Sequence, residues 1–227
     1  MKRATWMLTA LTLLLGGLGQ AKAGFINGNF GTGDLTGWTV FTTSNGTNGT
    51  LNGVTLPEVV SFDTTGTGAT NSAHFNVGEV SFNQTQQGGG LIQDVILAAG
   101  SHTITGNFAS QDSPNGLVNR DAGTFSVLLD GSSIFSRRLG GFGSPHQILR
   151  GTYQAPFDTT DIGIHQIEFL ITRRFISADI RTPQEYLTNL SITGTIPAPE
   201  PASLTLLGLG SLGLLGYGRK RRQQAAA

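Results

Sequence analysis

The stretch TFSVLLDG at residues 124–131 decides the fold class. Its apolar residues Phe125, Val127 and Leu129 alternate with a threonine and a serine, and the stretch ends on an Asp-Gly pair. Alternation with a period of two places one set of side chains on each face of a β-strand, and Asp-Gly is a strong signal for a hairpin turn. The stretch therefore predicts a strand with one buried face, followed by a tight turn.

Similar runs flank this stretch along most of the chain. Residues 103–108 and 165–172 alternate in the same way, and their predicted inward side chains are Ile104, Phe108, Ile167, Phe169 and Ile171. Further β-rich runs, separated by Gly, Asn, Asp and Pro, occur at residues 40–43, 59–62, 73–77 and 186–193. No amphipathic helix of useful length is found among them. We therefore expect an all-β body at residues 24–197, a single antiparallel β-sandwich of the jelly-roll kind.

Two segments of the body are predicted to be connections. Gly88-Gly89-Gly90 lacks the following Lys-Ser/Thr and helix of a phosphate-binding loop, and is expected to be a flexible loop. Pro156 predicts a turn after Tyr153.

Composition excludes several classes of protein. The chain has 227 residues, is 38% hydrophobic and contains 13 Phe, so it buries enough apolar surface to fold. It has no Cys, which excludes a disulfide scaffold, a thiolate metal site and a Cys nucleophile. The predicted body carries seven Arg and thirteen acidic residues, a net charge of −6. A body of this charge repels phosphate backbones, so we expect no nucleic-acid partner.

The N-terminus has the pattern of a secretory signal peptide, residues 1–23. Lys2 and Arg3 precede an apolar run, and Ala21-Lys22-Ala23 is a small-x-small cleavage site for signal peptidase. The alternative is an uncleaved membrane anchor, although the apolar run is shorter than the roughly 20 residues that a spanning helix needs.

The C-terminus, residues 198–227, combines three features in order. Pro199-Glu200-Pro201 comes first, an uncharged Leu- and Gly-rich run from Ala202 to Tyr217 follows, and the chain then carries the basic cluster Arg219, Lys220, Arg221 and Arg222. The apolar run is just long enough for a short transmembrane helix, and the cluster would stay on the cytoplasmic side.

This order resembles the PEP-CTERM protein-sorting signal of Gram-negative bacteria. The resemblance implies recognition by an exosortase-type membrane protease, transient membrane anchoring, and delivery of the body to the cell surface or extracellular matrix. The alternative is a permanent C-terminal anchor.

The body itself resembles galactose-binding-like jelly rolls, the fold of many carbohydrate-binding modules. The opening residues 25–30 and 33–38, with an Asn-Gly-Asn-Phe strand and a Gly-Trp step, carry the resemblance. Residues 91–95, 128–131 and 187–192 match the middle and last strands. Relatives with a structural Ca²⁺ have carboxylates where this chain has Gly31 and Asn189, so only Asp34 and Asn189 remain as weak Ca²⁺ candidates.

A glycan site needs an exposed ring and polar partners. Trp38 and Tyr153 are the candidate rings, and Arg120, in the polar loop 111–121 with Pro114-Asn115-Gly116, completes the expected ligand rim. For Trp38 we favour a position capping the core over a place on the rim, because large rings are mostly buried.

No catalytic motif is present in the body. The acids Glu58, Glu79, Glu168 and Glu185 offer no obvious acid-base pair, and His102 and His165 share the phase of core residues, which favours structural roles. We therefore expect no enzyme and no cofactor, but an exported, non-catalytic protein of the cell surface or exopolysaccharide matrix whose sandwich contacts glycans. The alternatives are a secreted hydrolase of glycans or esters, such as a glycoside hydrolase, and a protein-binding adhesin.

Overall fold

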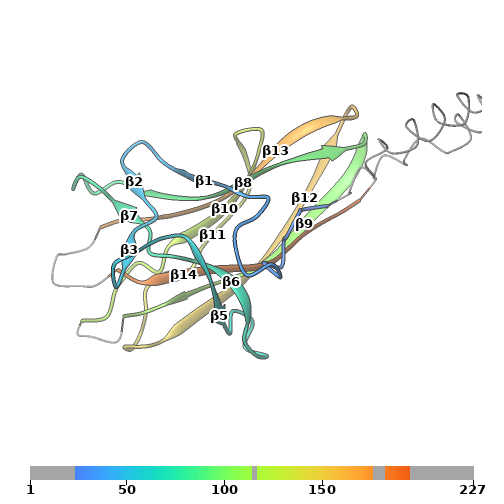
Figure 1. Ribbon diagram of the computed structural model, residues 1–227. Helices are drawn as coiled ribbons and strands as arrows, with labels where there is room; N and C mark the ends of the chain where they lie inside the picture. The colour runs from blue at the N-terminus through green and yellow to red at the C-terminus, as the bar shows by residue number, and fades with distance from the viewer. Residues whose placement is uncertain (1–23, 114–116, 176–181, 195–227) are drawn as a thin grey trace, which may run out of the picture. The chain divides into compact units, whose positions relative to one another are not determined.

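The computed structural model describes residues 24–113, 117–175 and 182–194, which belong to one compact unit, Lys22–Ile196 (Figure 1). These residues contain fourteen β-strands and no helix, so none of them forms a helix able to cross a bilayer. The all-β class is confirmed. The expected terminal helices, the cleavage site at Ala21 and Ala23, the Pro-Glu-Pro element and the basic cluster lie outside the described residues.

Ten strands form two five-stranded antiparallel sheets. The first sheet has the order β1 (Thr39–Thr42), β8 (Gln87–Leu97), β13 (Gly163–Arg173), β10 (Thr124–Leu129), β11 (Ser132–Arg138). The second has the order β12 (Ile148–Thr159), β9 (Gly100–Gln111), β14 (Gln184–Gly194), β6 (Thr70–Phe75), β5 (Glu58–Phe62). Two small ribbons pair β2 (Gly46–Thr47) with β7 (Gly78–Glu79) and β3 (Thr50–Leu51) with β4 (Val54–Thr55).

The core lies between the two sheets and consists of the side chains that the alternation predicts. The fully buried residues include Ile104, Phe108, Phe125, Val127, Ile167, Phe169 and Ile171. Leu129 is half-buried and packs against this core. The antiparallel β-sandwich is thus confirmed, together with its inward faces.

The predicted turn after the decisive strand is also confirmed. Asp130 and Gly131 have φ angles of 50° and 77° and connect β10 to β11. Positive φ at both central residues is the requirement of a type I′ hairpin turn, which Asp-Gly meets with little strain.

The prediction of a flexible loop at Gly88-Gly89-Gly90 is wrong. All three glycines belong to β8 and are buried between β1 and β13. A Cβ at Gly90 would overlap the carbonyl oxygen of Phe169, and one at Gly89 would overlap that of Phe41. The glycines are therefore needed for close approach of the neighbouring backbones, which a pattern of side-chain hydrophobicity does not reveal.

The turn expected at Pro156 is a second error. Pro156 lies inside β12, paired with Thr103 of β9. Because β12 is the last strand of its sheet, one side of its backbone has no partner strand, and a residue without an N–H is tolerated there.

Replacement of Gly90 by Ala tests this close approach. We expect Gly90→Ala to lower the free energy of unfolding by about 3 kcal/mol, because overpacking against backbone atoms forces the strands apart. Gly163→Ala is the control, since the nearest atom to its Cβ would be Nε2 of His165 at 3.8 Å, and we expect a change within about 0.5 kcal/mol. Urea denaturation measures both, and equal stabilities of the two variants would contradict the prediction.

Candidate functional site

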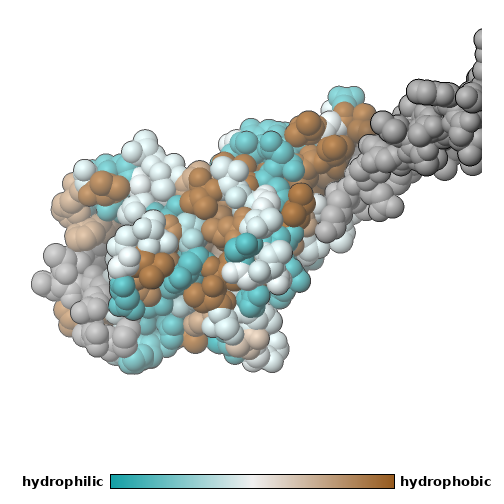
Figure 2. All heavy atoms as spheres, in the orientation of Figure 1, coloured by the Kyte–Doolittle hydropathy of each residue, from teal (hydrophilic) through white to brown (hydrophobic). Residues whose placement is uncertain are grey.

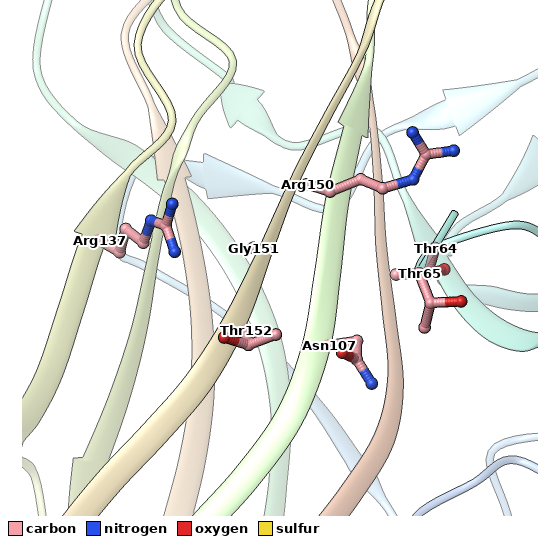
Figure 3. A pocket seen from close by; sticks show the side chains of 7 residues that line it. All are labelled: Thr64, Thr65, Asn107, Arg137, Arg150, Gly151 and Thr152. Atoms are coloured by element: carbon pink, nitrogen blue, oxygen red, sulfur yellow. The ribbon is translucent and has the colours of Figure 1, made fainter. Parts of the chain in front are cut away.

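The strongest candidate site lies on the outer face of the second sheet. Asn107 of β9 and Thr152 of β12 are register partners, and their neighbours Phe108 and Tyr153 are buried in the core. Because successive side chains of a strand point to opposite faces, Asn107 and Thr152 point away from the core. Figure 3 shows the two side chains next to each other on adjacent strands.

The segment that follows β5 closes one side of this face. Arg150 of β12 donates two hydrogen bonds to the carbonyl oxygen of Asp63, from Nε at 3.3 Å and from Nη2 at 3.0 Å. Its guanidinium also lies 3.6 Å from the Asp63 carboxylate. Since β5 and β12 are the two edge strands, this latch connects opposite edges of the sheet.

The latched segment is itself well ordered by hydrogen bonds. Asp63 Oδ1 accepts hydrogen bonds from the backbone N–H groups of Gly66 and Gly68. Desolvation tends to raise the pKa of this carboxyl, but the hydrogen bonds and the charge of Arg150 together keep the pKa below its usual value. Thr64 is buried and its hydroxyl lies 2.9 Å from that of Ser72 on β6. These hydrogen bonds hold the segment in one position over the sheet.

Between the latch and the sheet edge lies a groove of about 270 Å³, which we call the outer groove (Figure 3). It is lined by Thr64, Thr65, Asn107, Arg137, Arg150, Gly151 and Thr152. Arg137 comes from β11 of the first sheet, which lies beside β12 at this edge. The lining contains amide, hydroxyl and guanidinium groups, and neither an acidic nor an aromatic side chain.

Several of these polar groups have no partner. Within the described residues, no hydrogen bond or ion pair engages the side chains of Asn107, Thr152 or Arg137, whereas Arg150 and Thr64 are held by the latch and by Ser72. The outer groove thus offers free donors and acceptors at fixed positions, which is the arrangement that binds a polar ligand.

The structure places Trp38 in the core, as favoured from the sequence, and not on the ligand rim. Trp38 is 8% exposed, and its ring lies 5.3 Å from that of Phe25 and 5.8 Å from that of Phe169. Its Nε1 donates a hydrogen bond to the carbonyl oxygen of Asn27 at 3.2 Å. The core-capping alternative is therefore the right one, and Trp38 has no face free for a ligand.

Tyr153 is also absent from any rim, because it is 1% exposed. Its ring packs against Phe108, Phe135 and Phe169 at centroid distances of 4.7, 5.5 and 5.3 Å. Burial raises the pKa of its hydroxyl, which has no hydrogen-bond partner among the described residues. The alternation along β12 turns Tyr153 inward and leaves Thr152, which sequence reasoning missed, facing the outer groove.

Arg120 is exposed but does not line the outer groove, so the structure does not bring the three expected rim residues together. Much of the loop around it is buried: Asn119 accepts a hydrogen bond from the N–H of Asp121, and Asp121 accepts one from the N–H of Arg174. Pro114-Asn115-Gly116 lies outside the described residues.

The residues of the opening segment do not fit a Ca²⁺ ion. Asn27 Nδ2 donates to the carbonyl oxygens of Asp34 and Thr36, so these two oxygens near Asp34 already accept hydrogen bonds. The Asp34 carboxylate accepts hydrogen bonds from Thr32 Oγ1 and the N–H of Thr36, and these lower its pKa. Asn189 is exposed, at an irregularity of β14 with φ of 53°. In the described part of the chain, no three His, Asp or Glu residues lie close enough together to hold a metal ion.

Among the described carboxyl groups, Glu185 has a strongly raised pKa. It is fully buried on β14, and its Oε2 accepts a hydrogen bond from the N–H of Val77 at 3.0 Å. Burial raises the pKa of Glu185 to about 8, and the nearby charge of Arg173 opposes this shift. Arg173 is 2% exposed, donates to the carbonyl oxygen of Val77, and lines a second cavity of about 300 Å³ together with Glu79.

Three other candidates from the sequence, Glu168, His102 and His165, lie on strands other than that of Glu185. Glu168 is half-buried on the outer face of β13, as its polar phase predicts. His102 Nε2 lies 2.9 Å from the carbonyl oxygen of Ala98 and 3.1 Å from the hydroxyl of Thr159, which confirms its structural role. His165 pairs with Asp130 at 2.8 Å at the β10–β11 turn.

Comparison with protein families identifies the C-terminal segment. The PEP-CTERM protein-sorting motif matches residues 197–222, which contain Pro199-Glu200-Pro201 and the basic cluster. The predicted sorting signal is confirmed. It indicates an exported protein that is sorted at the membrane by an exosortase-type system of Gram-negative bacteria. No curated protein matches the chain.

Solved structures with a similar fold include two carbohydrate-binding modules. TmCBM61, in complex with beta-1,4-galactotriose, is 12% identical, covers 76% of this chain and 99% of its own, and has a TM-score of 0.43. The CBM22-1 xylan-binding domain of Paenibacillus barcinonensis Xyn10C is 13% identical, covers 78% and 99%, and has a TM-score of 0.40. A cyclase from Fischerella sp. TAU is 13% identical, covers 72% and 87%, and has a TM-score of 0.42. At these values the likeness extends to neither a site nor a function.

The environment of Glu185 predicts the pH dependence of stability. In the unfolded chain this carboxyl loses its proton near its ordinary pKa of 4.5, whereas the native protein keeps it up to about pH 8. The native state then binds more protons between these values, so stability falls as the pH rises, by up to about 1.4 kcal/mol for each pH unit. We expect Glu185→Gln to flatten this decline in urea denaturation.

Glu168→Gln is the matched control because Glu168 lies on the outer face of its strand. It should keep the wild-type slope between about pH 5 and pH 8. An unchanged slope in Glu185→Gln would show that Glu185 is ionised in the native protein.

Proposed function

We propose that the protein is an exported, non-catalytic component of the cell surface or exopolysaccharide matrix, and that it contacts glycans through the outer groove. The observation that carries the proposal is the set of free polar groups at the latch: Asn107 and Thr152 side by side, with Arg137 at the same edge. The PEP-CTERM motif supports the place of action, because it belongs to exported proteins.

The chemistry of the outer groove suits a carbohydrate. Sugars present many hydroxyl groups, and binding them requires donors and acceptors whose positions are fixed before the ligand arrives. Asn107 lies on the interior strand β9 and Thr152 on the edge strand β12. The hydrogen bonds from Arg150 to Asp63 hold the segment that forms the other wall of the groove. Little ordering of the protein is then needed on binding.

The proposal of a non-catalytic role is supported by the placement of the acids. A glycosidase of the usual kind needs two carboxyl groups flanking the scissile bond. None of the four candidate acids Glu58, Glu79, Glu168 and Glu185 lines the outer groove. Glu185, whose pKa is raised, is enclosed in the core. The groove therefore binds without a group that transfers a proton.

The termini complete the proposal. Signal peptidase removes residues 1–23 after Ala23, the apolar run from Ala202 to Tyr217 anchors the precursor in the membrane, and an exosortase-type protease cuts near Pro199-Glu200-Pro201. The released body then reaches the cell surface or matrix.

Asn107 gives the direct test of glycan contact. We expect Asn107→Ala to weaken retention on extracellular polysaccharide in affinity electrophoresis by about tenfold, since a lost hydrogen bond inside a binding site costs on the order of 1 kcal/mol or more. Gln154→Ala is the control: Gln154 is exposed on the same strand as Thr152 and does not line the groove. No retention of the wild-type protein on any extracellular polysaccharide would refute glycan contact.

The sorting signal is tested by the fate of the C-terminus. Replacement of Pro199, Glu200 and Pro201 by Ala should leave the protein in the membrane fraction, because the cleavage system no longer recognises it. Intact mass of the wild-type surface form should lack both termini. A full-length wild-type product at the cell surface would contradict processing.

A further inference from the structure

We infer that the ligand of the outer groove is an anionic polysaccharide, bound through carboxylate groups of its sugars. This inference rests on the proposed glycan contact and names its chemical class. The observation that carries it is the charge of the lining, which contains Arg137 and Arg150 and no acidic side chain.

The two guanidinium groups have different states. Arg150 is engaged in the latch and lies 3.6 Å from the Asp63 carboxylate, so much of its charge is balanced. Arg137 is exposed, and within the described part of the chain no carboxylate lies within ion-pair distance of it. Arg137 therefore supplies one uncompensated positive charge to the lining of the outer groove, and Figure 3 shows its side chain on the strand that flanks this edge.

Arg137 is one of three exposed arginines without an ion pair in the described part of the chain, and it differs from Arg120 and Arg174 because it lines the outer groove. The body has a net charge of −6, and its other arginines include Arg138, which pairs with Asp121 at 3.5 Å, and Arg173, which is buried near Glu185. At an ionic strength of 0.15 M, the field of distant acids is screened beyond about 8 Å, so the groups lining the outer groove govern contact with a ligand.

The position of Arg137 on β11 also departs from the strand pattern. Arg137 is the register partner of Phe125, which is fully buried, so its side chain starts from the inward side of the edge strand. An inward charge on an edge strand can protect a sheet from pairing with another chain. Protection of the edge alone would not require Arg137 to line the same groove as Asn107 and Thr152. It also predicts that replacing Arg137 leaves ligand binding unchanged.

The absence of rings from the lining supports the same chemistry. The lining residues include no aromatic side chain, and Trp38 and Tyr153 are in the core, so the outer groove offers no stacking surface for a neutral sugar ring. Affinity must then come from hydrogen bonds, and those to a charged group are the strongest. A guanidinium and a carboxylate form two parallel hydrogen bonds, while Asn107 and Thr152 are available for hydroxyl groups.

The experiment compares a polyuronate with its own neutral form. Polygalacturonate and carboxyl-reduced polygalacturonate share linkage and size but differ in charge, and EDTA prevents bridging by divalent cations. In affinity electrophoresis or calorimetry of the full purified protein, we expect the acidic polymer to bind at least about tenfold more tightly. Arg137→Gln should lose this difference, whereas Arg174→Gln, an exposed arginine outside the outer groove, should keep it.

The outcomes separate the inference from the proposal beneath it. Equal binding of the acidic and reduced polymers, weakened by Asn107→Ala, would overturn the anionic ligand and leave glycan contact intact. Equal weakening by Arg137→Gln and Arg174→Gln would also overturn it, because it would show general charge attraction. Binding of neither polymer, nor of any other polysaccharide, would overturn both. Circular dichroism confirms that each variant is folded.

Discussion

The contact between Phe108 of β9 and Phe125 of β10 joins the two sheets, and the position of the outer groove depends on it. The rings are stacked with centroids 4.4 Å apart, and both side chains are fully buried. Gly151, the register partner of Phe108 on β12, leaves room for this pair, because a Cβ there would overlap the Phe108 ring. With Phe108 held inward, the strand period places Asn107 outward, and the inward ring of Tyr153 does the same for Thr152.

The latch between Arg150 and Asp63 turns this outer face into a groove. Without it, Asn107 and Thr152 would stand on an open sheet surface, where water competes for every polar group. Two hydrogen bonds to the Asp63 carbonyl oxygen and the buried Thr64 hydroxyl hold the segment after β5 across the sheet. A groove wall made in this way is rigid at little cost, since its polar groups are satisfied within the wall.

The buried ionisable groups of the sandwich have a different role from the arginines of the outer groove. Glu185 and Arg173 are both buried, near Asp121, at the ends of β14 and β13. Burying ionisable groups is costly, and burial keeps Glu185 protonated up to about pH 8 although Arg173 lies nearby. Glu185 accepts a hydrogen bond from the N–H of Val77, and Arg173 donates one to its carbonyl oxygen, so the two side chains hold the segment after β6. The raised pKa of Glu185 reflects the free-energy cost of burying its carboxylate.

The sequence by itself determined the all-β class, the inward faces of the central strands, the Asp130-Gly131 turn and the C-terminal sorting motif. Each of these features depends on residues close together in the sequence. The strands follow from alternation with a period of two, the turn from a residue pair that accepts positive φ, and the sorting motif from a short linear pattern. Only the tertiary structure placed Gly88-Gly89-Gly90 in a central strand, turned Tyr153 inward, and brought Arg137 from one sheet to Asn107 and Thr152 of the other. Each of these depends on which strands become neighbours and on how closely their backbones approach. The hydrophobic pattern of a single strand predicts neither property, because both depend on the strand that packs against it.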